Sequence, residues 1–319
     1  MPVKLLLPDH LVERLREPVG QIVPDSHIIP VGPDGEVTED LEGAEILFLS
    51  WRMSPEAIRR LIAYAPHLRW VHAVSAGVDH LLFPELQDSD IILTNARGVF
   101  SVPIAEMVMA YILAVAKRLP EFWDSQREHR WEKLSLRELH GLTVGIIGLG
   151  DIGTEVARRC RVFGMHVLGL RRHPGPGDLA DEVLPPARLP DLLARADFVV
   201  IAVPLTPETR GLIGRAELAA MKPDAWLINI SRGAVVDEEA LIEALQARCI
   251  GGACLDVFVE EPLPPQSPLW EMPNVLITPH NSWSSPHIEA RQMTLFLENL
   301  RRYVAGEPLQ NVVDKQAGY

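Results

Sequence analysis

Three charged side chains of different kinds follow three apolar segments in the second half of the chain. Arg232 follows "DAWLINIS", Glu261 follows "GGACLDVFVE", and His280 follows "NVLITP". A guanidinium group binds anions, and an imidazole exchanges a proton near neutral pH. If the apolar segments are parallel strands, the three groups lie at carboxyl ends of strands, where open α/β sheets bind their ligands. The set could therefore bind an anion and exchange a proton with it.

Each of these residues also has a plain alternative. Arg232 could be a surface arginine, Glu261 a solvated carboxylate in a proline-rich loop, and His280 a histidine bonded to backbone. Taken singly, the plain alternatives are favoured, because charged side chains are common on surfaces. Their occurrence at three successive strand ends favours a site.

A glycine pattern precedes these residues. Gly148, Gly150 and Gly153 form GxGxxG between a strand candidate, "TVGIIG", and a helix candidate, "IGTEVARRCRVFG". The first glycine permits a tight turn, the second lets backbone approach a pyrophosphate, and the third lets the helix pack on the strand. The helix N-terminus supplies N–H groups and a partial positive charge for the phosphates. The pattern predicts a dinucleotide site; the alternative is a strand-turn-helix without a ligand.

The next strand candidate, 166–170, ends in Arg171 and Arg172. NAD-binding folds usually place an acid about 20 residues after the first glycine, where it accepts a hydrogen bond from the ribose 2′-hydroxyl. Here that place falls on Arg171, which can instead pair with a 2′-phosphate, and Arg172 could join it. We therefore expect NADP(H) to be preferred, with NAD(H) possible. The alternative is that both arginines point into water.

Composition limits the remaining possibilities. A chain of 319 residues suits two domains, and a net charge of -13 argues against nucleic acid or an anionic membrane as the main partner. Cys160, Cys249 and Cys254 have no metal-binding spacing, so we expect no metal and three reduced thiols in the core of a cytoplasmic protein. The short apolar run in 1–10 predicts no signal peptide, and the most hydrophobic helix candidate, 107–116, is shorter than the ~20 residues of a membrane span.

Short apolar strands alternate with helical patterns along most of the chain. Strand candidates in the first part are 3–8, 44–51, 68–77 and 90–95, and a helix is expected after Ser54, with Pro55 at its first position. A nearly all-apolar helix, 101–120, must be buried on most sides, between domains or against a second subunit. We expect a polar surface connection over 121–141, a second α/β alternation over 142–278, and a last helix beginning at 285.

Several long segments resemble the D-isomer-specific 2-hydroxyacid dehydrogenases, among them the glyoxylate/hydroxypyruvate reductases and phosphoglycerate dehydrogenases. These segments are "VSAGVDHL", "NARGVFSVPIAEMVMAYILA", "VGIIGLGDIG", "AVPLTPETRGLI", "LINISRGAVVDEEAL", "LDVFVEEPLP", "TPH" and "GEPLQNVV". The resemblance implies an α/β fold with two doubly wound parallel-sheet domains. A flavodoxin-like substrate domain would comprise 1–100 and 284–319, and an inserted Rossmann-type nucleotide-binding domain would comprise 101–283. It also implies a homodimer formed through the helix after Ser101.

The resemblance implies a catalytic set of Arg232, Glu261 and His280. With the glycines and arginines above, the expected cofactor-binding set is Gly148, Gly150, Asp151, Ile152, Gly153, Arg171, Arg172, Val203, Pro204, Thr209, Ile230, Ser231 and Asp256, the last at the nicotinamide carboxamide. The expected substrate contacts are Ser75, Ala76, Gly77, Val78, Arg232 and His280.

The residue chemistry agrees with the reduction of a 2-oxo acid to a D-2-hydroxy acid. His280 would give the proton, Glu261 would favour the imidazolium and fix the ring, and Arg232 would bind the carboxylate and polarise the carbonyl. The substrate side chain and the physiological direction stay open, and the sequence after His280 departs from the family pattern at Asn281-Ser282-Trp283. The alternatives are a dinucleotide-sensing, corepressor-like protein without turnover, and a formate dehydrogenase-like relative, from which Glu261 departs.

Overall fold

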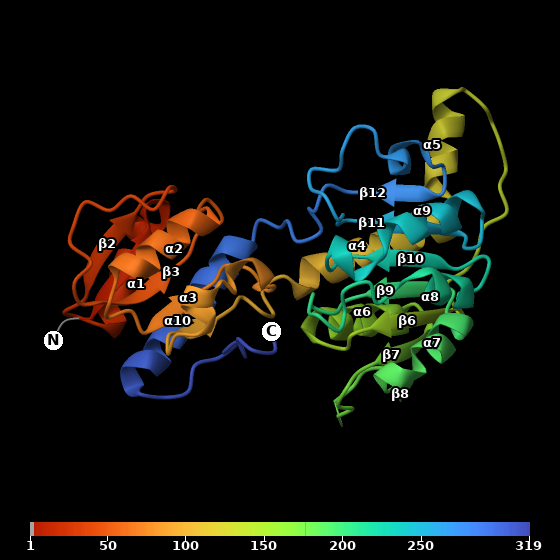
Figure 1. Ribbon diagram of the computed structural model, residues 1–319. Helices are drawn as coiled ribbons and strands as arrows, with labels where there is room; N and C mark the ends of the chain where they lie inside the picture. The colour runs from red at the N-terminus through yellow and green to blue at the C-terminus, as the bar shows by residue number, and fades with distance from the viewer. Residues whose placement is uncertain (1–2, 176) are drawn as a thin grey trace. The chain divides into compact units, whose positions relative to one another are not determined.

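The computed structural model describes residues 3–175 and 177–319. The chain divides into two compact units, the first made of 1–100 and 285–319 and the second of 101–284 (Figure 1). The second unit is thus inserted into the first, and the first contains both ends of the chain.

The first unit is built on a five-stranded parallel sheet. Its strands are β1 (Lys4–Pro8), β2 (His27–Val31), β3 (Ala44–Phe48), β4 (Trp70–His72) and β5 (Ile92–Thr94), in the order β2-β1-β3-β4-β5. This order is that of flavodoxin-like sheets. Its helices are α1 (Val12–Ile22), α2 (Pro55–Tyr64), α3 (Pro84–Gln87) and α10 (Ile288–Ala305), with 3-10 turns η1 (Asp9–Leu11) and η2 (Asp79–Leu81).

The sequence predicted four of these five strands. The unexpected one, β2, contains Pro30, which lacks a backbone N–H and is tolerated in sheets mainly on edge strands. β2 is an edge strand, so the missing donor breaks no ladder on its outer side. The helix predicted after Ser54 is α2, and the Ser54 hydroxyl accepts a hydrogen bond from the Ala57 N–H at 3.1 Å.

The C-terminal helix α10 completes the first unit's core. Figure 1 shows it in blue among the red and orange elements from the start of the chain. Phe296 and Leu300 of α10 lie in one apolar cluster with Leu5 and Leu7 of β1. Residues some 290 positions apart in sequence therefore share one core, which explains why the chain must return to this unit after the insertion.

The second unit contains a seven-stranded parallel sheet. Its strands are β6 (Thr143–Ile147), β7 (His166–Leu170), β8 (Glu182–Leu184), β9 (Phe198–Ile201), β10 (Trp226–Asn229), β11 (Gly252–Leu255) and β12 (Val275–Ile277), in the order β12-β11-β10-β9-β6-β7-β8. The helices are α4 (Ser101–Ala116), α5 (Leu119–Arg127), α6 (Asp151–Val162), α7 (Leu189–Arg195), α8 (Arg215–Ala220) and α9 (Glu238–Gln246), with 3-10 turns η3 (Pro186–Arg188), η4 (Gly233–Val235) and η5 (Pro268–Glu271). The order reverses between β6 and β9, as in dinucleotide-binding folds.

Two local expectations were wrong. The helix predicted over 101–120 ends at Ala116, and a separate helix, α5, begins at Leu119 and runs into the polar surface connection predicted over 121–141. Cys249 is exposed, because it lies in the turn between α9 and β11, whereas Cys160 and Cys254 are buried as expected. The long apolar helix is α4, which packs against α6 and is largely buried within its own unit. Within the described residues, no helix has the length and apolar character needed to cross a membrane.

The first unit buries a histidine inside an aromatic cluster. His72 lies among Phe48, Trp70 and Phe296, with ring centroids 5.3, 6.0 and 5.8 Å away. The Thr94 hydroxyl accepts from the Trp70 indole N–H at 2.7 Å and also hydrogen-bonds to His72 Nδ1 at 2.8 Å. His72 Nε2 has no hydrogen-bond partner among the described residues, and burial lowers the pKa of His72 from 6.5 to about 3.

This histidine should make the protein acid-sensitive. The folded state keeps His72 neutral down to about pH 3, whereas the unfolded chain binds a proton below 6.5, so stability is full above pH 6.5 and is lost as the pH falls towards 3. At pH 5.0 the loss should reach about 2 kcal/mol relative to pH 7.5. Urea unfolding at the two pH values should show this difference shrinking in His72→Leu and persisting when the exposed His287 is changed to Gln. An equal pH dependence in all three proteins would contradict the assignment.

Candidate active site

The predicted site residues of the second unit lie in the loops at the carboxyl ends of its strands. Because all seven strands are parallel, their carboxyl ends lie on the same side. The glycine-rich turn follows β6, and Arg171 and Arg172 follow β7. Arg232 follows β10, and the segments that carry Glu261 and His280 follow β11 and β12. The phosphate-binding candidates and the catalytic candidates therefore lie on opposite sides of the point where the strand order reverses.

His280 and Glu261 form a direct pair. The distance from His280 Nδ1 to Glu261 Oε2 is 2.7 Å, and both side chains are about one-third exposed. The other carboxylate oxygen of Glu261 accepts from the Phe258 N–H at 2.9 Å, which orients the carboxylate. The pair leaves Nε2 as the ring nitrogen of His280 that points away from Glu261, and a carboxylate at Nδ1 is the arrangement that orients an acid–base histidine.

The backbone of His280 is held in an unusual conformation. Its φ is +50°, in the left-handed region that costs a residue with a Cβ about 1 kcal/mol or more. Its N–H lies 2.8 Å from the Asp256 carbonyl oxygen, and its own carbonyl accepts from the Trp283 indole N–H at 2.9 Å. Trp283, which departs from the family pattern, thus fastens the segment that presents the imidazole.

A buried carboxylate anchors the same segment. Asp256 is fully buried, and its Oδ1 accepts from the N–H groups of Asn281 at 2.9 Å and Ser282 at 3.2 Å. The Thr278 hydroxyl also donates to Oδ1, and the Tyr111 hydroxyl of α4 hydrogen-bonds to Thr278. Burial raises the pKa of Tyr111, so its hydroxyl keeps its proton and can donate. The hydrogen bonds that join Tyr111, Thr278 and Asp256 therefore hold the segment that carries His280 in place.

Arg232 is placed by a tight backbone turn. The Asn229 side chain brackets the turn: its Oδ1 accepts from the Ser231 N–H at 3.1 Å and its Nδ2 donates to the Arg232 carbonyl at 3.0 Å. A Cβ on Gly233 would lie 2.0 Å from the Phe258 carbonyl carbon, so only glycine lets the two loops touch. The N–H of Phe258 donates to Glu261. Through Phe258, the turn that carries Arg232 is therefore packed against the residue that orients the glutamate.

The glycine-rich turn has the close approaches expected of a phosphate-binding loop. Gly148 has φ +102°, and a Cβ there would lie 2.7 Å from the Ala202 carbonyl oxygen. A Cβ on Gly153 would lie 2.0 Å from the Gly148 carbonyl oxygen, so the helix packs on the turn as predicted. Gly150 faces open space at the N-terminus of α6, which begins at Asp151 with Ile152 next. The turn could therefore bind a pyrophosphate through backbone N–H groups and the N-terminus of α6.

The arginines after β7 already have acidic neighbours. Arg171 forms an ion pair with Asp178, and Arg172 Nη2 lies 3.9 Å from Glu208 Oε2. Both guanidinium groups remain about half exposed. They can therefore still reach a ligand at the strand end, in competition with these carboxylates.

The other expected cofactor residues lie in the loops after β9 and β10. Val203 and Pro204 follow β9 after Ala202, and Ile230 and Ser231 follow β10. Thr209 is buried, and its hydroxyl donates to the Pro204 carbonyl at 2.6 Å and accepts from the Thr206 N–H at 2.8 Å. Thr209 thus closes the loop that carries Val203 and Pro204.

In the first unit, the loop after β4 carries the expected substrate contacts Ser75, Ala76, Gly77 and Val78. Its carbonyls are bonded inward: Val74 accepts from Gln292 at 2.7 Å, Ser75 from the Ala96 N–H at 2.9 Å, and Ala76 from Asn95 at 2.7 Å. These carbonyls are therefore used inside the first unit, and the role of the loop's N–H groups as donors to an anion stays a prediction.

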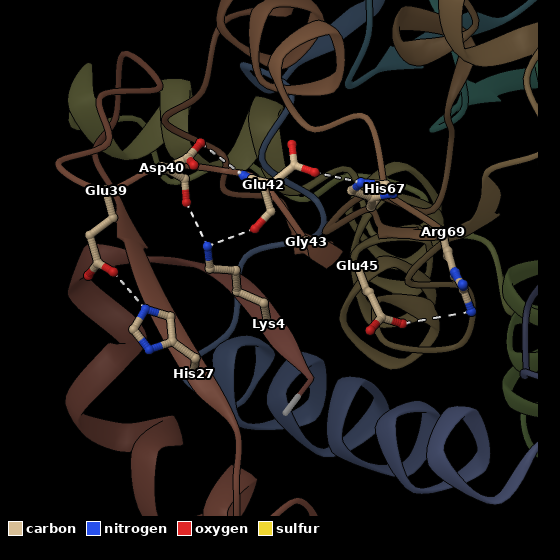
Figure 2. Close-up of a pocket in the computed structure, with 9 residues that line it drawn as sticks. All are labelled: Lys4, His27, Glu39, Asp40, Glu42, Gly43, Glu45, His67 and Arg69. Atoms are coloured by element: carbon tan, nitrogen blue, oxygen red, sulfur yellow. Dashed lines mark hydrogen bonds and ion pairs between the residues drawn. The ribbon is translucent and has the colours of Figure 1, made fainter. Parts of the chain in front are cut away.

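A charged pocket of about 870 Å³ lies at the amino ends of the first unit's strands, the end opposite the loop that follows β4 (Figure 2). Lys4 Nζ donates to the Asp40 and Glu42 carbonyls at 2.7 and 2.8 Å, and the His27–Glu39 and His67–Glu42 pairs measure 2.6 and 2.8 Å. These contacts fasten loops at the amino ends of the strands. Because ligands of open α/β sheets bind at the carboxyl ends, this pocket is not the active-site candidate.

Sequence reasoning missed three residues of the second unit's site: Tyr111, Asn229 and Thr278. Each lies inside a quoted segment, but none carries a charge. The one available signal was the single hydroxyl of Tyr111 in a helix otherwise apolar over 107–116. Among the described residues, no cluster of three or more His, Cys, Asp or Glu side chains could hold a metal ion.

The family model described as "D-isomer specific 2-hydroxyacid dehydrogenase, NAD binding domain" matches residues 109–282. The chain is 34% identical over 98% of its length to the D-3-phosphoglycerate dehydrogenase of Methanocaldococcus jannaschii, of which it spans only 59%. It is 38% identical to the glyoxylate reductase of Korarchaeum cryptofilum, over 79% of this chain and 78% of that one.

A solved structure resembles the whole chain. It is the crystal structure of an NADPH-dependent glyoxylate/hydroxypyruvate reductase from Sinorhizobium meliloti in complex with NADP and sulfate. The TM-score is 0.85 at 31% sequence identity, with 100% of both chains covered.

Gly233→Ala should disrupt the site without removing any polar group. The added Cβ would meet the Phe258 and Val259 backbone, which cannot move aside as a side chain could. We expect a loss of stability of about 2–3 kcal/mol, measured by thermal unfolding. Gly20→Ala in α1 is the control, because a Cβ there meets nothing within 4 Å and helix propensity favours alanine. A Gly233→Ala protein as stable as Gly20→Ala would contradict the close contact.

Proposed function

Because the chain belongs to the D-isomer-specific 2-hydroxyacid dehydrogenase family, we propose that its site reduces a 2-oxo acid to the D-2-hydroxy acid with His280 as the proton donor. The protein is an NAD(P)-dependent oxidoreductase acting on the CH–OH group of its donor. The observation that carries the assignment of roles is the His280–Glu261 pair at 2.7 Å, at the same sheet edge as the Arg232 turn.

The dinucleotide supplies a hydride to carbon 2 of the substrate. His280 delivers a proton from Nε2 to the carbonyl oxygen, while Glu261 holds Nδ1 and stabilises the positive ring. Arg232 binds the carboxylate and polarises the carbonyl with its guanidinium group, a charge-assisted contact. Ser75, Ala76, Gly77 and Val78 contribute backbone N–H groups to the carboxylate. In this proposal the first unit is the substrate domain and the second the nucleotide-binding domain.

The proposed cofactor contacts follow the strand order of the second unit. Gly148, Gly150, Asp151, Ile152 and Gly153 hold the pyrophosphate, and Arg171 and Arg172 hold the 2′-phosphate of NADP(H). The contacts beyond the point where the strand order reverses are Val203, Pro204, Thr209, Ile230, Ser231 and Asp256, the last proposed to meet the nicotinamide carboxamide. Asp256 also holds the segment that carries His280.

Small 2-oxo acids such as glyoxylate and hydroxypyruvate are the proposed substrates, supported by the reductases that the chain resembles. The test is a panel of 2-oxo acids that includes pyruvate and bulkier side chains, each assayed with NADPH and with NADH. Reduction of none of them would count against the proposal. The cytoplasmic location expected from the cysteines remains a prediction.

His280→Ala should abolish reduction while the dinucleotide still binds, because the ring acts on the substrate. Glu261→Gln should keep part of the activity, since an amide can still contact Nδ1 but no longer stabilises a positive ring. We expect a loss in kcat of about 10²–10⁴-fold for His280→Ala. Steady-state rates and dinucleotide fluorescence titrations measure the two effects. Activity of His280→Ala within tenfold of the unmodified protein would remove His280 from the proton step.

The unmodified protein should prefer NADPH to NADH in kcat/KM. Charge-assisted contacts to the 2′-phosphate are worth about 1.5–3 kcal/mol, or roughly 10- to 150-fold. Arg171→Asp should reverse the preference, because a carboxylate accepts from the 2′-hydroxyl and repels the phosphate. Equal efficiency with both cofactors before and after the change would show that the arginine does not contact the cofactor.

We also propose a homodimer that buries α4. Helix α4 leaves an apolar stripe of four side chains, of which Ala110 is exposed and Met107, Leu113 and Ala114 are partly exposed. These positions share one helix face, which suits a two-fold contact. Light scattering should give twice the mass of one chain at micromolar concentration, and Ala110→Glu should lower it towards the monomer. A stable monomer in the unmodified protein would contradict the proposal.

A further inference from the structure

The loop after β7 brings an acid to the arginine expected to hold the 2′-phosphate. Asp178 lies seven residues after Arg171, and Arg171 Nη1 donates to Asp178 Oδ1. The other oxygen, Oδ2, accepts from the Gly175 N–H at 2.8 Å. The Asp178 side chain is only 6% exposed, whereas that of Arg171 is 43% exposed. The carboxylate is therefore held within the loop between β7 and β8, whereas the guanidinium is shared between Asp178 and solvent.

The neighbouring arginine has a weaker acidic partner. Arg172 Nη2 lies 3.9 Å from Glu208 Oε2, and the Glu208 side chain is 68% exposed. The Thr206 hydroxyl donates to the same oxygen of Glu208 at 2.8 Å. Two positive and two negative groups thus occupy this corner, so the arginines do not present a net positive charge of two to a phosphate.

We propose that Asp178 sets the cofactor preference of this enzyme, by competing with the 2′-phosphate of NADP(H) for Arg171. The inference rests on the proposed function, since it concerns the 2′-phosphate contact assigned there to Arg171. Asp178 contacts neither the substrate nor the reacting atoms, so it is a specificity-determining residue and not a catalytic one. Its charge narrows the preference for NADPH over NADH by limiting how tightly the corner binds a phosphate.

Burial determines which acid has the larger effect. Charges near Asp178 are poorly screened because the carboxylate is almost fully covered, whereas solvent screens the charge of the largely exposed Glu208. A phosphate that pairs with Arg171 therefore experiences repulsion mainly from Asp178. The Arg171 guanidinium carries several N–H donors and can contact both anions at once, so the competition is partial.

The test uses the full chain and two small probes that report on this corner without turnover. 2′,5′-ADP carries the 2′-phosphate, and 5′-AMP carries the 2′-hydroxyl. In Asp178→Asn the amide oxygen can still accept from Gly175, but the negative charge is gone. Calorimetric titration should show 2′,5′-ADP binding three- to tenfold more tightly to Asp178→Asn, with 5′-AMP changed less than twofold. Glu208→Gln should give a smaller gain, under threefold.

Two further variants serve as controls. Asp178→Glu keeps the charge and should keep the unmodified ratio of the two affinities. Asp224→Asn removes a surface carboxylate that pairs with Arg137 at 3.3 Å beside the amino end of β10, and it should change neither affinity. The same thermal unfolding midpoint in Asp178→Asn and Asp224→Asn would show that the loop remains folded.

Unchanged or weaker binding of 2′,5′-ADP to Asp178→Asn would overturn the inference, and weaker binding would mean that the acid orients Arg171 for the phosphate. Arg171→Ala separates this result from a failure of the proposed function. If Arg171→Ala weakens 2′,5′-ADP and Asp178→Asn does not tighten it, only the role of Asp178 is wrong. If Arg171→Ala leaves 2′,5′-ADP binding unchanged, the 2′-phosphate site is wrong and the inference falls with it.

Discussion

The geometry of the segment that presents His280 depends on one buried carboxylate, which pairs with no cationic side chain among the described residues. Asp256 is fully buried at the end of β11 and receives hydrogen bonds from backbone N–H groups and a hydroxyl of the segment 278–282. Burying a carboxylate is costly unless donors surround it, so these donors must stay in place in the folded protein. The same segment carries the imidazole of His280. The backbone of His280 is in the left-handed conformation, which is unfavourable for a residue with a Cβ unless its surroundings hold it there. The hydrogen bonds to Asp256 thus hold the strained backbone in place, and the N–H groups of that backbone satisfy the buried carboxylate.

Backbone contacts, more than side chains, set the distances between the loops of this edge. Gly148 and Gly233 each allow one loop to lie against the backbone of another, where a Cβ would meet a carbonyl. Parallel strands bring the loops to one edge, and these glycines fix how closely the loops approach there. Charged side chains then occupy positions that are already determined, which is the preorganisation that polar catalysis requires.

The sequence predicted the elements whose signal is periodic or local. Alternating apolar segments identified most strands, and Ser54 with Pro55 identified the start of α2, because capping is a short-range interaction. It missed β2, whose proline resembles a breaker until the edge position is known, and α5, whose apolar side chains are few. It also missed contacts between distant residues that no spacing rule describes: Tyr111 meets Thr278 across 167 positions, and Asp178 reaches Arg171 through a proline- and glycine-rich loop. The catalytic and binding roles of the predicted residues remain predictions, because proximity of side chains does not by itself assign a reaction.

Helix α4 contacts elements from both sides of the point where the second unit's strand order reverses. Its Tyr111 bonds to the segment that carries His280, and its Met109 lies 3.6 Å from Cys160 of α6, the helix that begins at the glycine-rich turn. The helix therefore links the segment that carries His280 to the helix that follows the glycine-rich turn. A dinucleotide has a limited span between its pyrophosphate and its nicotinamide, and misplacing reacting groups by about 1 Å can cost 10²-fold in rate. Substitutions in α4 that displace Tyr111 or Met109 can therefore affect the site through the elements that the helix contacts.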